Sequence, residues 1–301
     1  MEDAISTVEE ALKQQALGSA VNRPRASVIA GPGAGLYSMQ AACPYLDVFG
    51  FKAYTAGSEG YRFLVYLYSA DTGELLSVLQ AGLLGQLRTG AATAVATSHM
   101  APGDASVVAI LGSGHQARTQ LEGICRVRAV TTARVYSPNA DHRRAYAEEI
   151  SRKLDVEVTP ADSPRLAVEG ADIVVTITDS RTPVLDGRWL QPGMHIAAVG
   201  GADMYVSELD DATFERANVV VVDDVAQARI ECGELIMATS NGVILWEQVR
   251  ELWQIVGGVT PGRRSPDDIT LFKSLGMALW DVAVAKAVYD QAVAQGVGTR
   301  L

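Results

Sequence analysis

The stretch Val107-Val108-Ala109-Ile110-Leu111-Gly112-Ser113-Gly114-His115-Gln116-Ala117 decides the fold of this chain. A short apolar run precedes a Gly-x-Gly-x-x-Ala turn, and an amphipathic segment follows it. This strand, turn and helix order is what a dinucleotide fingerprint requires. The glycines let the backbone approach a pyrophosphate, and the amides at the helix N-terminus hold its negative charge. The stretch therefore predicts a site for a phosphate-bearing cofactor, although a tight turn in any α/β protein has the same pattern.

The composition is that of a globular protein with enough apolar residues for two cores. The chain has 301 residues, 48% of them hydrophobic, and a formal net charge of -10. An acidic chain without clustered Lys and Arg is a poor partner for nucleic acid. The three cysteines and four histidines lack the spacing of metal ligands, so no metal is expected, and a reducing cytoplasm is the simplest location. No membrane partner is expected, because no apolar run approaches the length of a membrane span.

Residues 1–98 are predicted to form an α+β unit together with residues 279–301. The apolar spacing of residues 2–17 predicts a helix, and residues 48–54 and 61–68 have the aromatic and branched content of antiparallel strands. Asp71-Thr72-Gly73 predicts a hairpin turn. A further helix is expected over residues 82–100. Near the end of the chain, a long helical pattern through Leu271, Leu275, Leu279, Val282 and Val288 is expected to follow Pro266-Asp267-Asp268.

Residues 99–278 are predicted to form a second unit around a parallel sheet. Short apolar runs recur with helices or turns between several of them, as in buried parallel strands. Ser163 and Pro164 are suited to the start of one intervening helix. The apolar runs are residues 107–111, 133–136, 156–158, 173–177, 196–199 and 219–222.

The residues after the second strand of this unit bear on the choice of cofactor. An acidic side chain at that position would accept hydrogen bonds from the ribose hydroxyls of NAD. The sequence there is Tyr136-Ser137-Pro138-Asn139, with Arg143 and Arg144 one helical turn further. Ser137 offers no carboxylate, and the two arginines attract a 2′-phosphate unless they belong to a solvated helix face. The cofactor is expected to be NAD or NADP, and this segment favours NADP.

Three basic residues have both a structural and a chemical interpretation. Lys52 is either an edge-strand lysine that reaches water or a lysine in a partly dry cleft, where it could bind a carboxylate or move a proton. Arg25, beside Pro24, is either loop surface or a ligand contact. Arg88 precedes small residues that let a ligand come close, and its planar guanidinium suits a carboxylate or a phosphate. An interdomain ion pair is the structural alternative for Arg88.

Together these residues resemble one family, that of ornithine cyclodeaminase and mu-crystallin. Each motif alone is weak, but the set is specific and spans essentially the whole chain. The motifs are Phe51-Lys52, Arg88-Thr89-Gly90-Ala91-Ala92, Gly112-Ser113-Gly114-His115-Gln116-Ala117, Ala198-Val199-Gly200-Gly201, Glu231-Cys232-Gly233-Glu234 and Asp268-Ile269-Thr270-Leu271-Phe272-Lys273-Ser274.

The resemblance implies a fold, an assembly and a set of site residues. The implied fold is α/β, with a Rossmann-type doubly wound parallel sheet domain inserted in an α+β substrate-binding and dimerisation domain, and a homodimer is expected. Arg25, Lys52 and Arg88 are implied to bind the substrate carboxylate, with Lys52 catalytic at the amine. The expected cofactor-binding residues are Arg88, Gly112, Gly114, His115, Gln116, Ser137, Asn139, Thr178, Val199, Gly200 and Ser274.

The chain departs from the cyclodeaminase pattern in the residues that follow its paired glycines. Cyclodeaminases of this family carry an Asp directly after the paired glycines, where it serves as the acid or base of cyclisation. This chain reads Gly200-Gly201-Ala202-Asp203, so its Asp is displaced by one residue. Either a one-residue deletion returns Asp203 to the site, or the cyclisation acid is absent. Asp203 is therefore a second candidate catalytic residue.

The leading functional hypothesis is an NAD(P)-dependent oxidoreductase that interconverts an α-amino acid and its imino or keto acid. Such a ketimine reductase or amino acid dehydrogenase needs the cofactor site, Lys52 and Arg88, but not the missing acid. The alternative is an ornithine or lysine cyclodeaminase, a lyase that uses NAD catalytically and releases ammonia. A weaker alternative is a non-catalytic ligand carrier, which would keep the glycine turn without needing Lys52.

Overall fold

The computed structural model describes residues 1–299 and divides into two units. The first unit consists of Met1–Glu2 and Thr89–Gly276, and the second of Asp3–Arg88 and the described part of Met277–Leu301. One boundary lies inside helix α2 (Gly82–Met100), and another lies just before helix α10 (Ala278–Gln295). No helix within residues 1–299 combines the length and the apolar character needed to cross a bilayer.

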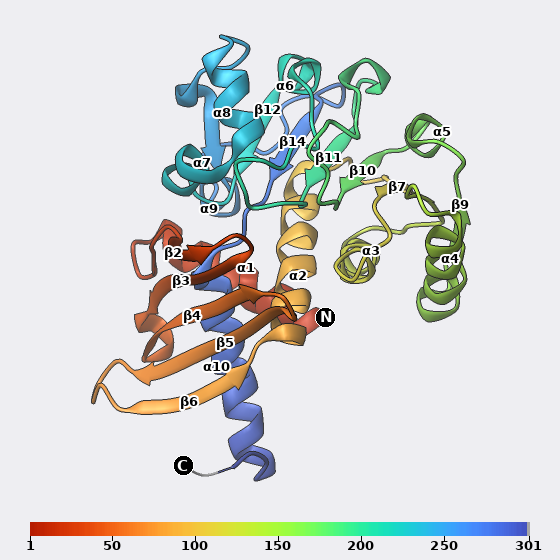
Figure 1. The fold of residues 1–301 in the computed structure, drawn as a ribbon. Coiled ribbons are helices and arrows are strands. Elements are labelled where there is room, and N and C mark those ends of the chain that lie inside the picture. Colours follow the sequence, from red (N-terminus) through yellow and green to blue (C-terminus); the bar gives the residue numbers. More distant parts are fainter. Residues whose placement is uncertain (300–301) are drawn as a thin grey trace. The chain divides into compact units, whose positions relative to one another are not determined.

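The second unit is built on an antiparallel sheet. Its strands lie in the order β1-β3-β4-β5-β6, and β2 also pairs with β3. Helix α10 packs against β3, β4 and β5, as the blue helix in Figure 1 shows. The elements are α1 (Glu2–Ala16), β1 (Val21–Asn22), β2 (Ala26–Gly31), β3 (Ala34–Cys43), β4 (Val48–Gly57), β5 (Gly60–Ser69) and β6 (Leu75–Gln80).

The first unit is built on a parallel sheet with the order β13-β12-β14-β11-β10-β7-β8-β9. The chain runs outward from β7 to β9 and then returns to the other side of β7, which is the doubly wound arrangement. The strands are β7 (Val107–Leu111), β8 (Thr132–Tyr136), β9 (Glu157–Pro160), β10 (Ile173–Thr176), β11 (His195–Ala198), β12 (Val219–Val222), β13 (Val249–Glu251) and β14 (Thr270–Lys273).

Alternating side chains of this sheet supply two apolar cores. Val108 and Ile110 of β7 belong to the core that contains residues of α3 and α4, whereas Ala109 and Leu111 belong to the core that contains residues of α5 to α8. This alternation explains why the strands read as continuous apolar runs. The helices are α3 (Ala117–Val127), α4 (Ala140–Leu154), α5 (Pro164–Val168), α6 (Asp211–Arg216), α7 (Val225–Glu231), α8 (Gly233–Ser240) and α9 (Leu252–Val256).

The expected fold class is confirmed, as are the elements predicted over residues 2–17, 48–54, 61–68 and 82–100 and the six parallel strands. The hydroxyl of Ser163 accepts a hydrogen bond from the Leu166 amide, so Ser163 caps α5 as expected. The long helix expected to include Leu271 and Leu275 is wrong in its first part. Thr270–Lys273 forms β14, because this segment is paired on both sides by β11 and β12 and needs apolar residues on both faces. Helix α10 begins only at Ala278.

Candidate active site

A cavity of about 730 Å³ lies at the carboxyl ends of the central strands of the first unit. Its lining includes residues that follow β7, β8, β10 and β11. Strands β7 and β10 are neighbours in the sheet although β8 and β9 separate them in sequence. Ligands of open α/β sheets bind at such a switch point, because the flanking connections leave in opposite directions there.

The glycine turn after β7 fits a dinucleotide phosphate. Gly112 has a φ of +119°, and a Cβ at this position would collide with the backbone of Ile177. A Cβ at Gly114 would meet nothing within 4 Å, so this glycine leaves open space beside the turn. Gln116 lines the cavity, and its buried Oε1 has no hydrogen-bond partner among the described residues. The turn leads into α3, where the amide of Ala117 donates to the carbonyl of Gly114 at 3.2 Å. The N-terminus of a helix favours an anion.

The segment after β8 also lines the cavity, and its side chains are fixed by local contacts. The hydroxyls of Ser137 and Ser113 are 2.8 Å apart, and the carbonyl of Ser137 accepts a hydrogen bond from Arg143 at 3.0 Å. Asn139 accepts hydrogen bonds from the Asp141 and His142 amides and so caps α4. His142 lines the cavity as well, whereas no carboxylate from this segment does.

The predicted cofactor-binding residues divide into those that line the cavity and those that do not. Lining residues are Gly112, Gly114, His115, Gln116, Ser137, Asn139, Thr178, Val199 and Gly200. Arg88 and Ser274 are not among them. Arg88 donates to Asp281, and the hydroxyl of Ser274 donates to Asp223 at 3.0 Å. Asp203 is also outside the lining. It lies in an exposed turn, where its carboxylate accepts a hydrogen bond from the Tyr205 amide.

Lys52 lies on β4, in the interior of the second unit. Strand β4 pairs with β3 and β5 on its two sides, so it is not an edge strand. The lysine is 3% exposed, and its Nζ lies 5.1 Å from the centre of the Phe63 ring and 5.9 Å from that of Tyr54. The interpretation of Lys52 as an edge lysine that reaches water is therefore wrong. The neighbouring strands β3 and β5 and the rings of Tyr54 and Phe63 exclude solvent from its side chain.

A carboxylate that the sequence interpretation missed joins Lys52 to Arg88. Oδ1 of Asp281, on α10, lies 3.1 Å from Nζ of Lys52 and 3.0 Å from Nε of Arg88. Asp281 is fully buried, and its Oδ2 has no hydrogen-bond partner among the described residues. One signal was present in the sequence. Asp281 is the single charged residue in the otherwise apolar segment 278–285, and a lone buried carboxylate requires a partner.

The surroundings lower the pKa of Lys52 from its ordinary value to about 8. Burial is the largest cause, because it penalises the ammonium form, and Arg88 and Arg25 add repulsion of like charge. Asp281 opposes these effects and raises the pKa. A lysine with a pKa near 8 exchanges protons readily at neutral to mildly alkaline pH, as a general acid or base requires.

Arg25 belongs to the same group of charges. Its guanidinium carbon lies 5.9 Å from the centre of the Tyr54 ring, which also faces Lys52. When all are ionised, Arg25, Lys52, Arg88 and Asp281 carry three positive charges and one negative charge. A group with this excess of positive charge is suited to hold a small carboxylate.

Comparison with known proteins gives the same result for the fold and the family. The model of the ornithine cyclodeaminase/mu-crystallin family matches residues 1–296. A Delta(1)-pyrroline-2-carboxylate reductase of Bacillus cereus is 34% identical over 87% of this chain and 83% of its own length.

Two solved structures extend the similarity to the whole chain. The Delta(1)-pyrroline-2-carboxylate reductase of Thermococcus litoralis, in complex with NADH and L-proline, has a TM-score of 0.96 and 33% identity, and the match covers 100% of this chain and 96% of that one. An archaeal alanine dehydrogenase dimer with bound NAD has a TM-score of 0.93 and 32% identity over 100% of this chain and 94% of that one. The protein is therefore an enzyme of the ornithine cyclodeaminase/mu-crystallin family.

Proposed function

We propose that this enzyme is an NAD(P)-dependent oxidoreductase that interconverts an α-amino acid and its imino or keto acid. The observation that carries the proposal is the buried group of Lys52, Asp281 and Arg88, in which a lysine with a pKa of about 8 lies beside an arginine. The similar reductase of Thermococcus litoralis holds an amino acid together with NADH, and this supports the assignment of substrate class.

The residues of the Lys52 group have separate roles in this reaction. A bound nicotinamide would donate or accept the hydride at the α-carbon of the substrate. Arg88 and Arg25 supply positive charge for the substrate carboxylate and so orient the α-carbon. Lys52, as the ammonium, gives a proton to the imine nitrogen during reduction, and as the neutral amine it accepts a proton during oxidation. Asp281 holds Lys52 and Arg88 in place through one oxygen atom.

The residues around the cavity of the first unit would hold the cofactor. The turn from Gly112 to Gln116 would receive the pyrophosphate, and Thr178, Val199 and Gly200 line the part of the cavity nearest β10 and β11. NADP is the proposed preference, because the segment after β8 places Ser137 and His142, rather than a carboxylate, against the cavity. The two solved relatives hold NADH and NAD, so this preference is a point on which the chain would differ from them.

A test of the reaction measures two products at once. The enzyme is incubated with a panel of cyclic imino acids, keto acids with ammonia, and amino acids, each with NAD(H) and NADP(H), while nicotinamide absorbance and ammonia are recorded. Net oxidation or reduction of the cofactor is the expected result. Release of ammonia from ornithine or lysine with the cofactor unchanged would instead identify a cyclodeaminase and would refute the proposal.

The proposed assembly is a homodimer formed through the antiparallel sheet. Phe49, Phe51, Tyr66 and Tyr68 lie on the face of β4 and β5 opposite to Lys52, and Phe51 stacks on Tyr66 at 4.5 Å. This face carries exposed apolar side chains, including Phe49, which is 40% exposed. Helix α10 packs against the other face of the sheet, the one that carries Lys52. An apolar patch of this kind marks an interface, and the archaeal alanine dehydrogenase is described as a dimer.

The assembly is tested with one substitution and a matched control. Phe51→Asp places a charge in the proposed interface, so a monomer is expected by size-exclusion chromatography with light scattering. Leu166→Asp changes another exposed apolar residue, on α5 of the first unit, and should leave the dimer intact. A dimer that survives Phe51→Asp at low micromolar concentration would refute an interface on this face.

A further inference from the structure

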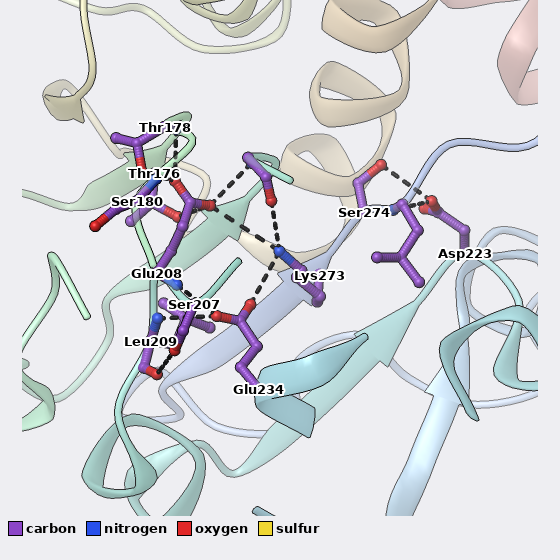
Figure 2. A network of polar contacts seen from close by, with 12 residues as sticks. Thr176, Thr178, Ser180, Ser207, Glu208, Leu209, Asp223, Glu234, Lys273 and Ser274 are labelled. Atoms are coloured by element: carbon purple, nitrogen blue, oxygen red, sulfur yellow. Dashed lines mark hydrogen bonds and ion pairs between the residues drawn. The ribbon is translucent and has the colours of Figure 1, made fainter. Parts of the chain in front are cut away.

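Three charged side chains are buried next to the cavity of the first unit without belonging to its lining. Glu208 and Lys273 are 0% and 2% exposed, and Glu234 is 6% exposed. Figure 2 shows them converging, with Glu208 reaching toward Thr176 and Thr178 and Lys273 lying between the two carboxylates. Among the described residues that hydrogen-bond to these three side chains, Gly200 and Thr178 are the two that line the cavity, so the charges act on the cavity through these two residues.

The carboxylate of Glu208 ties the ends of two neighbouring strands together. Its Oε1 accepts from the amide of Thr178 at 2.6 Å and from the Thr178 hydroxyl at 2.8 Å. Its Oε2 accepts from the hydroxyl of Thr176 at 2.8 Å and from the amide of Gly200 at 2.9 Å. Thr176 is the last residue of β10, Thr178 follows that strand, and Gly200 follows β11, so one side chain fixes the separation of both connections.

Lys273 and Glu234 hold Glu208 in this position. Nζ of Lys273 lies 2.9 Å from Oε1 of Glu234 and 4.0 Å from Oε2 of Glu208, and it donates to the carbonyl of Gly200 at 2.8 Å. Oε2 of Glu234 accepts from the amides of Glu208 and Leu209. Gly200 is thus held at both its amide and its carbonyl, and a Cβ on it would collide with Glu208 and with the backbone of Thr178.

Stability alone gives no reason to bury these charges. Removing ions from water is costly, and replacing buried ion pairs by packed apolar side chains is often neutral or stabilising. Burial raises the pKa of Glu208, while Lys273 and the threonine hydroxyls oppose this rise. Burial also lowers the pKa of Lys273, but Glu234 and Glu208 outweigh it, so that the pKa of Lys273 lies above its ordinary value. Apolar side chains would avoid these costs, but they could not bind two backbone amides.

We infer that Glu208 is a positioning residue for the nicotinamide cofactor, fixed by Lys273 and Glu234, which sets the relative placement of Thr178 and Gly200 in the cavity wall. The inference rests on the proposed function, because it takes the cavity to be the cofactor site. Glu208 itself does not line the cavity, so it acts through the main chain of the two lining residues.

Glu208→Gln is the sharpest test, because an amide cannot replace this carboxylate in either orientation. Each oxygen of Glu208 accepts from one backbone amide, of Thr178 or of Gly200. The NH₂ group of Gln therefore faces one backbone N–H whichever way the side chain is turned, and that donor loses its bond to residue 208. The Thr178 amide would lose its acceptor, and the Gly200 amide would keep only its longer bond, of 3.2 Å, to the carbonyl of Thr176. The dissociation constant of NADH or NADPH, measured by fluorescence titration, is expected to rise about tenfold or more.

A second pair of variants keeps the test decisive if Glu208→Gln does not fold. Thr176 donates to Glu208 but is fully buried and does not line the cavity. Thr176→Val removes the hydroxyl at nearly constant volume, and a rise of the dissociation constant of about two- to tenfold is expected. Thr176→Ser retains the hydroxyl and should restore cofactor affinity to near the wild-type value.

The control separates positioning from loss of stability. Ile150→Val shortens a buried side chain of α4 in the same unit, away from Glu208, and should lower Tm without changing cofactor affinity. The inference is overturned if Glu208→Gln or Thr176→Val binds the cofactor as the wild type does, or if Ile150→Val weakens binding equally at an equal loss of Tm. A wild-type enzyme that binds neither NADH nor NADPH would refute the proposed function instead.

Discussion

The cavity beside β7 is shaped largely by main chain, whereas the Lys52 site is made by side chains from three distant segments. Gly112, Gly114 and Gly200 act through the absence of a side chain, and two of them lie within one turn. Lys52 and Arg88 meet on an aspartate that lies 229 and 193 residues further along the chain. A site shaped by main chain should therefore lose ligand affinity when a side-chain atom is added. A site made by charged side chains should lose activity when a charge is removed. Five substitutions and one control test this contrast.

The largest effect is expected from Lys52→Ala. Removing the proton carrier should lower kcat/KM by about 10²- to 10⁴-fold in both directions of the reaction. Cofactor affinity should change little, because Lys52 does not line the cavity proposed for the cofactor. Lys286→Ala, on the same helix as Asp281, removes a lysine paired with Asp290 and should retain activity. An unreduced rate in Lys52→Ala would remove Lys52 from the mechanism.

The next effect concerns Asp281 and is read from the pH profile. In the reductive direction the ammonium form of Lys52 is required, so kcat/KM of the wild type should fall as pH rises through about 8. Asp281 raises this pKa, so Asp281→Asn should move the falling limb to lower pH. At pH 8, a loss of kcat/KM of about 10- to 100-fold is expected. If kcat/KM of Asp281→Asn falls over the same pH range as that of the wild type, the fall does not report the titration of Lys52.

An added methyl group should distinguish the two glycines of the turn. The added methyl group of Gly114→Ala meets no protein atom within 4 Å. The free energy of unfolding should therefore change by no more than about 0.5 kcal/mol, as for a surface substitution. The methyl group takes space intended for the pyrophosphate, so the cofactor dissociation constant should rise about tenfold.

Gly112→Ala serves as the contrasting variant for this turn. It combines a positive φ with a backbone collision and should lose about 1–3 kcal/mol of stability as well as cofactor affinity. Equal cofactor binding by Gly114→Ala and the wild type would place the pyrophosphate elsewhere.

The smallest effect is expected at the end of β8. Ser137→Asp introduces a carboxylate where an NAD enzyme would carry one, so it should weaken NADPH binding about fivefold and leave NADH binding unchanged or improved. The ratio of the two dissociation constants is the quantity to measure. A wild-type enzyme that already prefers NADH would refute the proposed preference for NADP.

The same contrast explains how much could be predicted from sequence. The parallel strands and the glycine turn were predictable, because local apolar runs and glycines encode them. Strand β14 was misassigned to a helix, because Leu271 and Leu275 match a helical period and a doubly buried strand has no alternation. Asp281 was missed because its role depends on a contact with Lys52 that local sequence does not contain. Glu208 acts through the backbone amides of Thr178 and Gly200, so its own sequence position carries no signal of this role.

The long separation between Lys52 and Asp281 also sets the order in which the protein is completed during synthesis. Domains generally fold as units while the chain is still growing. All strands of the first unit lie before residue 274, so they are all synthesised before α10. The antiparallel sheet lacks the packing of α10 until the end of the chain is made, and until then Lys52 and Arg88 lack their shared carboxylate. The charged group around Lys52 is consequently completed only when α10 is made, and a chain truncated before α10 would contain Lys52 and the residues of the cofactor cavity without the carboxylate that holds Lys52 and Arg88.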